Sequence, residues 1–245
     1  MPKSRRPDTL FAVPLERITA FTFDEQVANV FDDMIQRSVP GYATIVALSG
    51  LLAARYAQPQ TVAYDLGCSL GATTLAMLKH VQQPGFRVIA VDNSPAMIQR
   101  CKRNLEHAGV AKQVDLLCAD MRAVRIQRAS VCTLNFTLQF LPPGERLTLL
   151  RDIAAGMEPG GALILSEKMR FADESEAKLF TELHHAFKRA NGYSDLEIAQ
   201  KRAALEQVLI PDTLEEHAVR LAQAGFRESH LWFRCLNFAS LLAVK

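Results

Sequence analysis

The chain has 245 residues, of which 49% are hydrophobic and 22% are charged, and its formal net charge is +2. This composition is typical of a soluble globular protein and excludes a disordered one. The near-neutral charge gives no overall field that would attract nucleic acid. No apolar run approaches the ~18 residues of a membrane span, and no signal-peptide core follows the basic N-terminus. We therefore expect a cytoplasmic protein without a membrane anchor.

Residues 1–23 show no clear periodicity and are predicted to form an arm. Asp24 is the predicted N-cap of a helix that ends at Pro40-Gly41. One face of this helix carries Val27, Phe31, Met34 and Ile35. A second helix is predicted over 42–56, so residues 1–60 are expected to form an N-terminal helical arm.

Strands and helices alternate over residues 61–166, which predicts a parallel sheet with right-handed crossovers. The predicted strands cover residues 61–66, 86–91, 114–118, 129–136 and 162–166. The predicted helices cover 72–81, 94–108 and 145–157, and the Glu-Pro-Gly-Gly sequence at 158–161 is predicted to be a turn. Residues 168–212 then show helical periodicity and no strand, so we interpret them as a helical insert split at Asn191-Gly192.

The end of the chain is predicted to be a helix and two strands. The helix is expected to begin at an Asp212 N-cap and to stop at Gly225. The strands cover 226–235 and 238–244, and their short link predicts a hairpin. We therefore predict a single domain over residues 1–245, an α/β, doubly wound, Rossmann-like fold with a mostly parallel seven-stranded sheet and an antiparallel C-terminal hairpin.

The five cysteines are an odd number, are widely spaced and include no Cys-x-x-Cys motif. We interpret them as reduced core thiols and predict no metal site. Cys68 alone falls in a predicted turn, where it can line a ligand site.

Polar residues follow the carboxyl ends of four predicted strands. They are the turn at 67–71, Asp92, Asp120 and Asn135. In doubly wound sheets ligands bind at this edge, near the point where the strand order reverses. Asp92 lies 21 residues after Gly71, a spacing at which a carboxylate binds a ribose diol. Each residue alone also fits a structural cap, but together they predict a nucleotide site.

The turn itself disfavours a dinucleotide. Gly67-x-Ser69-x-x-Ala72 has serine where Gly-x-Gly-x-x-Gly/Ala requires the central glycine. Asp65, just before the first glycine, is the one charge of its strand and needs a partner. It is expected to repel phosphate and to suit a ligand with an ammonium group.

These segments resemble the class I S-adenosylmethionine-dependent methyltransferase fold. The segments that carry the resemblance are Asp65-Leu-Gly-Cys-Ser-Leu-Gly71, Val91-Asp92, Ala119-Asp120 and Pro159-Gly-Gly-Ala-Leu163. The resemblance covers roughly residues 60–167 and 212–245. It implies that the turn holds the methionine part, Asp92 the ribose hydroxyls, and Asp120 with Met121 the adenine.

Two features outside the core bear on the reaction. Asn135-Phe-Thr-Leu138 differs from the Asn/Asp-Pro-Pro-aromatic sequence of amino methyltransferases and disfavours N-methylation. Arg202 is spaced by four and three residues from Ile198 and Leu205, which predicts that it lies on the apolar stripe of its helix. An arginine there needs an anion. It is either a structural pair with Asp or Glu, a snorkelling surface residue, or a fork for a substrate carboxylate.

Nearly the whole chain resembles the bacterial carboxy-S-adenosyl-L-methionine synthase family. The matching segments are 35–42 (Ile-Gln-Arg-Ser-Val-Pro-Gly-Tyr), 92–97, 134–141, 165–168, 187–194 and Glu197-Ile-x-Gln-Lys-Arg202. This resemblance implies carboxyl transfer from prephenate to the methyl group of S-adenosylmethionine, with phenylpyruvate as the second product. The methyl group, as an ylide beside the sulfonium, is implied to capture CO2.

The family also implies a homodimer and a partner enzyme that uses the product to modify the tRNA wobble uridine. This chain itself then needs no contact with RNA, in agreement with its charge. The implied ligand residues are Tyr42, Gly67, Cys68, Ser69, Asp92, Asn93, Asp120, Met121, Asn135 and Arg202. Arg202, facing the transferred carboxylate, and Tyr42 are the implied catalytic residues.

Two other functions stay open at this point. The chain can be an S-adenosylmethionine-dependent methyltransferase acting on a small molecule or RNA, or a non-catalytic nucleotide-binding subunit. Tyr42 can be a packing residue at a helix start, and His184-His185 are interpreted as surface or core residues. Three basic residues can hold a second substrate carboxylate or be solvated, and no role is assigned to them. They are Arg37, Lys188 and Arg189.

Overall fold

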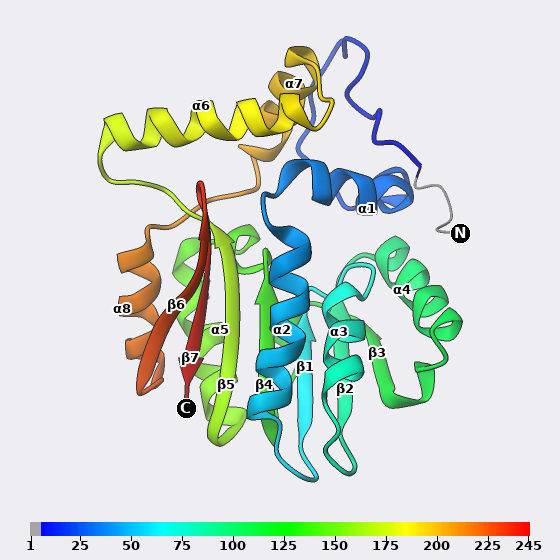
Figure 1. Cartoon of the computed structure of the whole chain (residues 1–245), viewed down its shortest axis with the longest axis vertical. Coiled ribbons are helices and arrows are strands. Elements are labelled where there is room, and N and C mark those ends of the chain that lie inside the picture. Colours follow the sequence, from blue (N-terminus) through cyan, green and yellow to red (C-terminus); the bar gives the residue numbers. More distant parts are fainter. Residues whose placement is uncertain (1–5) are drawn as a thin grey trace.

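The computed structural model describes residues 6–245 and contains a seven-stranded sheet in the order β3-β2-β1-β4-β5-β7-β6 (Figure 1). The strands are β1 Val62–Leu66, β2 Arg87–Asp92, β3 Val114–Cys118, β4 Ala129–Asn135, β5 Met157–Lys168, β6 Glu228–Cys235 and β7 Phe238–Val244. The first five strands pair in parallel, and β7 pairs antiparallel with β5 and β6. The predicted α/β fold and its C-terminal hairpin are therefore confirmed.

The helices agree closely with the predicted ones. They are α1 Glu25–Ser38, α2 Tyr42–Tyr56, α3 Ala72–His80, α4 Pro95–His107, α5 Pro143–Gly156, α6 Glu174–Ala190, α7 Asp195–Leu205 and α8 Leu214–Ala224. Asp24 caps α1 by accepting a hydrogen bond from the Val27 amide at 2.9 Å. Ser94 caps α4, and Pro95 occupies its first turn. Short polar side chains thus fix these helix starts where the sequence indicates them.

Two hydrophobic layers enclose the sheet. On β4, Cys132 and Leu134 belong to the cluster packed against α5 and α8, whereas Val131 belongs to the cluster on the side of α2, α3 and α4. Alternate residues of one strand therefore face opposite layers, and this is why the central strands read as continuous apolar runs.

Three sequence predictions were wrong in detail. Residues 158–161 are not a separate turn, because β5 begins at Met157 and takes up these residues at an irregularity in its pairing with β4. Thr213, not Asp212, is the N-cap of α8, where it forms a capping box with Glu216. Cys118 is exposed and so is no core thiol, although all five cysteines are free.

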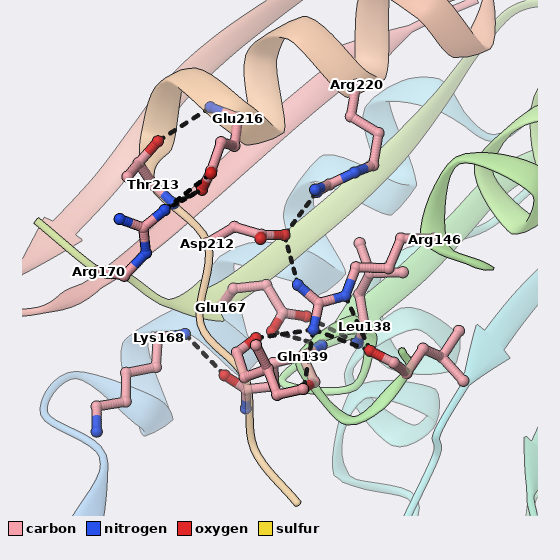
Figure 2. Close-up of polar contacts among 12 residues, drawn as sticks. Leu138, Gln139, Arg146, Glu167, Lys168, Arg170, Asp212, Thr213, Glu216 and Arg220 are labelled. Carbon is pink, nitrogen blue, oxygen red and sulfur yellow. Dashed lines mark hydrogen bonds and ion pairs between the residues drawn. The ribbon is translucent and has the colours of Figure 1, made fainter. Parts of the chain in front are cut away.

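Asp212 instead belongs to a buried ion pair. Its carboxylate contacts Arg146 at 2.5 Å and Arg220 at 2.6 Å (Figure 2). Arg146 is fully buried and also donates to the carbonyl groups of Leu141 and Ile210. This cluster fastens the end of the helical insert to the start of α5.

The N-terminal arm lies across the insert. Gln200 of α7 accepts a hydrogen bond from the Leu15 amide and donates to two carbonyl groups of the arm. Asp8 is buried and pairs with Lys201 of α7 at 3.3 Å. Arm, α1, α6 and α7 together cover the carboxyl edge of the parallel strands (Figure 1). Within the described part of the chain, no helix has the length and apolar character needed to span a membrane.

Candidate active site

A cavity of about 780 Å³ lies at the carboxyl ends of β1, β2 and β4, where the strand order reverses. Its volume falls within the range of about 300–1,000 Å³ usual for small-molecule sites. All ten predicted ligand residues line it, although they come from segments as distant as Tyr42 and Arg202. The structure therefore brings the predicted residues together, while their role in binding stays a prediction.

The turn after β1 depends on glycine at its first position. Gly67 has φ of +80°, and a Cβ atom there would lie 2.3 Å from the Thr137 hydroxyl oxygen. The amides of Gly67 and Cys68 donate to the Val91 carbonyl at 2.8 and 2.9 Å. The turn is thus held against β2 and packed closely on the loop that follows β4.

Asp65 does not face the cavity. Its buried carboxylate accepts hydrogen bonds from the hydroxyl groups of Thr74 at 2.6 Å and Thr133 at 2.7 Å. Burial raises the pKa of Asp65, and these two hydrogen bonds oppose that rise. The expectation that Asp65 meets a ligand ammonium group is therefore wrong, because its partners are two threonines of the core.

Asp92 has free acceptor positions at the site. Its two oxygens accept the amides of Ser69 and Ser94, each at 2.9 Å. A carboxylate offers about four lone-pair sites, so two remain for a ligand diol. Burial raises the pKa of Asp92, and the two amide hydrogen bonds oppose that rise. These bonds also fix the carboxylate between the glycine turn and the start of α4.

Asp120 is held by its neighbour Arg122. The Asp120 carboxylate accepts the Arg122 amide at 2.9 Å and pairs with the Arg122 guanidinium. The hydrogen bonds to Arg122 lower the pKa of Asp120 and outweigh its slight burial. Asp120 is thus a fixed negative group beside Met121 in the lining of the cavity.

Asn135 and Tyr42 also line the cavity. The Asn135 amide donates to Thr73 at 3.1 Å, and its oxygen accepts the Ser166 hydroxyl at 2.7 Å. The Tyr42 ring packs 6.2 Å from that of Phe136, a non-glycine residue with φ of +60°. Burial, followed by the charges of Asp32 and Asp65, raises the pKa of Tyr42, so its hydroxyl stays protonated.

The prediction that Arg202 occupies the apolar stripe of its helix is wrong. The Arg202 side chain is 54% exposed, and its Nε lies 2.5 Å from Glu206. The buried residues of α7 are Glu197, Ile198, Gln200, Lys201 and Ala204. Arg202 still lines the cavity, at the boundary with a second, smaller pocket that also contains Glu206.

Sequence reasoning named Lys188 without assigning it a role and missed the rest of the basic end of the cavity. Lys168, His184, Lys188 and Lys201 line it together with Arg202. His184 donates from Nε2 to the Ser38 carbonyl at 2.8 Å, and burial lowers the pKa of His184 to about 3. The spacing of four residues between His184 and Lys188 was the available signal, because it places both on one helix face.

The thiol of Cys68 has no sign of nucleophilic activation. A hydrogen bond with Cys101, followed by burial, raises its pKa well above the ordinary value.

Within residues 6–245 no group of three or more His, Cys, Asp or Glu side chains is arranged to hold a metal ion.

Comparison with known proteins identifies the chain's relatives. A family model described as "Methyltransferase domain" matches residues 63–161. A carboxy-S-adenosyl-L-methionine synthase of Vibrio campbellii is 54% identical, over 100% of this chain and 99% of its own length. The chain belongs to the carboxy-S-adenosyl-L-methionine synthase family. Synthases of the same name from Trichlorobacter lovleyi and Klebsiella pneumoniae are 57% and 53% identical, over 99% and 97% of this chain and 100% and 96% of their own lengths.

Solved structures show how this synthase family member is related to methyltransferases in fold. Human N-acetylserotonin methyltransferase, solved in complex with SAM, has a TM-score of 0.62 at 20% identity, over 98% of this chain and 63% of that one. A putative S-adenosyl-L-methionine-dependent methyltransferase of Methanococcus maripaludis also scores 0.62 at 16% identity, over 93% of this chain and 95% of its own. At this level of identity the likeness establishes the class I methyltransferase fold alone.

Proposed function

We propose that this chain transfers the carboxyl group of prephenate to the methyl group of S-adenosylmethionine. The observation that carries the proposal is the full-length identity of 54% with a named carboxy-S-adenosyl-L-methionine synthase. The products are carboxy-S-adenosylmethionine, phenylpyruvate and water. Aromatisation of the prephenate ring drives the loss of its carboxyl group and its ring hydroxyl.

The nucleoside is proposed to occupy the end of the cavity formed by the strand termini. The two unused lone-pair positions of Asp92 suit the ribose diol, with Asn93 beside it. Asp120 and Met121 suit the adenine, and the turn at 67–69 suits the methionine part.

Arg202 is proposed to bind the transferred carboxylate. Its guanidinium lines the cavity and is already paired with a carboxylate, that of Glu206. A substrate carboxylate can replace that partner in the same fork geometry. Arg202 would then orient the carboxyl group toward the methyl carbon and favour the charge that develops there. Tyr42, protonated and half-buried, is proposed to line the reacting end as a hydrogen-bond donor.

Incubation of the protein with S-adenosylmethionine and prephenate tests the proposal. We expect a nucleoside product heavier than S-adenosylmethionine by the mass of CO2, formed in a one-to-one ratio with phenylpyruvate and detected by mass spectrometry. A heat-denatured sample controls for the spontaneous breakdown of prephenate. Consumption of S-adenosylmethionine without this product would contradict the proposal.

A methyltransferase acting on a small molecule or RNA is the second candidate, because the matching family model and the structural neighbours are methyltransferases. Transfer of labelled methyl groups to a cell extract would favour it. Nucleoside binding with neither reaction would instead indicate a non-catalytic nucleotide-binding subunit.

We also propose that the protein is a cytoplasmic homodimer whose product is used by a tRNA-modifying partner enzyme, without direct contact between this chain and nucleic acid. Exposed leucines on the insert, Leu179, Leu183 and Leu196, offer apolar area for subunit contact. Light scattering coupled to size exclusion tests the dimer, and a tRNA gel-shift assay tests the absence of RNA binding.

Replacement of Gly67 by alanine is expected to weaken S-adenosylmethionine binding at least about tenfold. The left-handed backbone disfavours alanine by roughly 1–2 kcal/mol, and the new Cβ overlaps Thr137. Gly109→Ala is the matched control, because Gly109 has φ of +72° and nothing within 4 Å. Both variants should lose thermal stability, but only Gly67→Ala should lose affinity in calorimetry. Equal affinity in the two variants would contradict the assignment of this turn.

A further inference from the structure

The basic end of the cavity carries more positive than negative charge. Four cationic side chains line it, and two carboxylates compensate two of them. The pairs are Lys201 with Asp8 and Arg202 with Glu206. Among residues 6–245 no carboxylate lies within salt-bridge distance of Lys168 or Lys188. Two positive charges are therefore left without a partner.

Lys188 is the more deeply placed of the two. Its side chain is 6% exposed, on the face of α6 that also carries the buried His184. Burial, followed by the charges of Lys201, Lys168 and Arg202, lowers its pKa to about 7. An ammonium group in such surroundings destabilises the fold unless an anion compensates it. Such a lysine either loses its proton or needs an anion, and a bound carboxylate would supply that anion from the cavity.

Lys168 approaches from the sheet. It ends β5, and its amide donates to the Gln139 side chain at 3.1 Å. Its side chain points away from the cluster of Arg146, Asp212 and Arg220 (Figure 2). Burial and then the charge of Arg202 lower the pKa of Lys168, with Glu206 opposing. Lys168 and Lys188 thus face the same cavity from the sheet and from the insert.

A second unsatisfied group lies at this end. Asn237, in the link between β6 and β7, is 5% exposed and lines the cavity. Its side-chain oxygen has no hydrogen-bond donor among the described residues. Buried polar atoms in proteins are normally paired, so this orphan acceptor indicates that the ligand brings a hydrogen-bond donor, which a carboxylate lacks but the ring hydroxyl of prephenate has.

We propose that Lys188 and Lys168 form an anion subsite for the carboxylate that the second substrate retains in its product, an α-keto acid. This inference rests on the proposed function, in which the carboxyl donor is a dianion. One carboxylate leaves and meets Arg202, and the other stays on the product. Lys168 and Lys188 are two basic side chains without a carboxylate partner. The second carboxylate would supply the negative charge that neither of them has nearby. The subsite would select a dicarboxylate over a monocarboxylate donor.

The product isolates this subsite, because phenylpyruvate carries the retained carboxylate and lacks the transferred one. We expect Lys188→Met to weaken phenylpyruvate binding, titrated by calorimetry at saturating S-adenosylmethionine, by about 10- to 100-fold. The KM for prephenate should rise by a similar factor. Lys168→Met should act in the same direction. Lys178→Met, which removes an exposed lysine of the same helix, should change neither quantity.

Two further readouts separate binding from folding. The melting temperature of Lys188→Met should equal or exceed that of the wild type, because the substitution removes an unpaired buried charge. Its affinity for S-adenosylmethionine should stay within about threefold of the wild-type value. Arg202→Ala should leave the affinity for phenylpyruvate within the same limit, since Arg202 meets the other carboxylate.

Retained phenylpyruvate affinity in Lys188→Met, or no phenylpyruvate binding by the wild type, would overturn the subsite. An equal loss of stability and nucleoside affinity in Lys188→Met would also overturn it, in favour of a structural role. Lysine-dependent phenylpyruvate binding in a protein that does not consume prephenate would support the subsite and overturn the proposed function. Turnover of prephenate with an unchanged KM in both lysine variants would support the proposed function and overturn the subsite.

Discussion

Arg202→Ala is expected to lower kcat for carboxyl transfer by about 100- to 1,000-fold, the usual effect of removing a group that stabilises charge in a transition state. The affinity for S-adenosylmethionine should change by less than about threefold. Arg202 is 54% exposed and pairs with Glu206, which is itself 59% exposed, so the loss of Arg202 leaves no buried partner unpaired. Steady-state kinetics together with calorimetry separate the two effects.

Arg189→Ala is the matched control for this prediction. Arg189 is 50% exposed and pairs with Asp195 at 3.0 Å, but it does not line the cavity. Its loss should leave turnover unchanged. Arg202→Lys should recover only part of the activity, because lysine keeps the charge but loses the two-pronged geometry. If Arg202→Ala kept wild-type turnover, the proposed role of Arg202 in the reaction would be wrong, and Arg202 would only form a surface ion pair with Glu206.

Asp212→Asn is expected to lower the free energy of unfolding by about 3–5 kcal/mol, the range for breaking a buried ion pair. Arg146 would keep its charge at 0% exposure and lose its carboxylate partner. Hydrogen bonds to carbonyl groups alone do not neutralise that charge. For a chain of this length, such a change corresponds to a fall in melting temperature of roughly 10 °C. Differential scanning calorimetry and chemical denaturation measure both quantities.

Asp115→Asn provides the control, since Asp115 pairs with Arg87 at 2.6 Å but both side chains are about half exposed. Its cost should be below about 1 kcal/mol. Equal losses of stability in the two variants would contradict the prediction that the buried Asp212 pair stabilises the fold more than an exposed pair does.

The pH dependence of stability gives a second check. Burial raises the pKa of Asp212, but hydrogen bonds from Arg220 and Arg146 outweigh burial and lower it overall.

The sign of that pH effect follows from the lowered pKa. The folded protein binds a proton at Asp212 less readily than the unfolded chain does, so the pair stabilises the fold above the unfolded pKa of about 3.9. This stabilisation is lost as the pH falls through the lower, folded value. The difference in stability between the wild type and Asp212→Asn should therefore shrink on acidification below about pH 4.

Much of the fold could be predicted from the sequence, because the signals were local. The Asp24 and Ser94 caps, the glycine turn at Gly67 and the short β-hairpin link each depend on residues a few positions apart. The capping error at Asp212 was also local. Both Asp212 and Thr213 are acceptable caps, and only the distant arginines decide which one is free to cap.

The sequence predicted which residues line the candidate site, but it did not predict which of their charges form ion pairs. Resemblance named ten residues, and all of them line one cavity. Helical periodicity misplaced Arg202, because it treats the face that carries the apolar Ile198 and Leu205 as the buried face of α7. The buried face instead includes Lys201, whose partner Asp8 lies 193 residues away. No pattern within one helix contains that information.

The sequence by itself determined the order of strands and helices, the nucleotide-binding edge of the sheet and the family of the chain. The elements and the edge depend on short-range backbone preferences and on the alternation of apolar residues, which are readable along the chain, whereas the family came from the resemblance of its segments to known sequences. Only the tertiary structure decided which charges are compensated. The arm and the insert supply Asp8 and Glu206 to two of the cavity's cations, and no segment within residues 6–245 supplies a carboxylate to Lys168 or Lys188. Compensation is set by distance in space and by burial, so the unpaired lysines become visible only when the chain is folded.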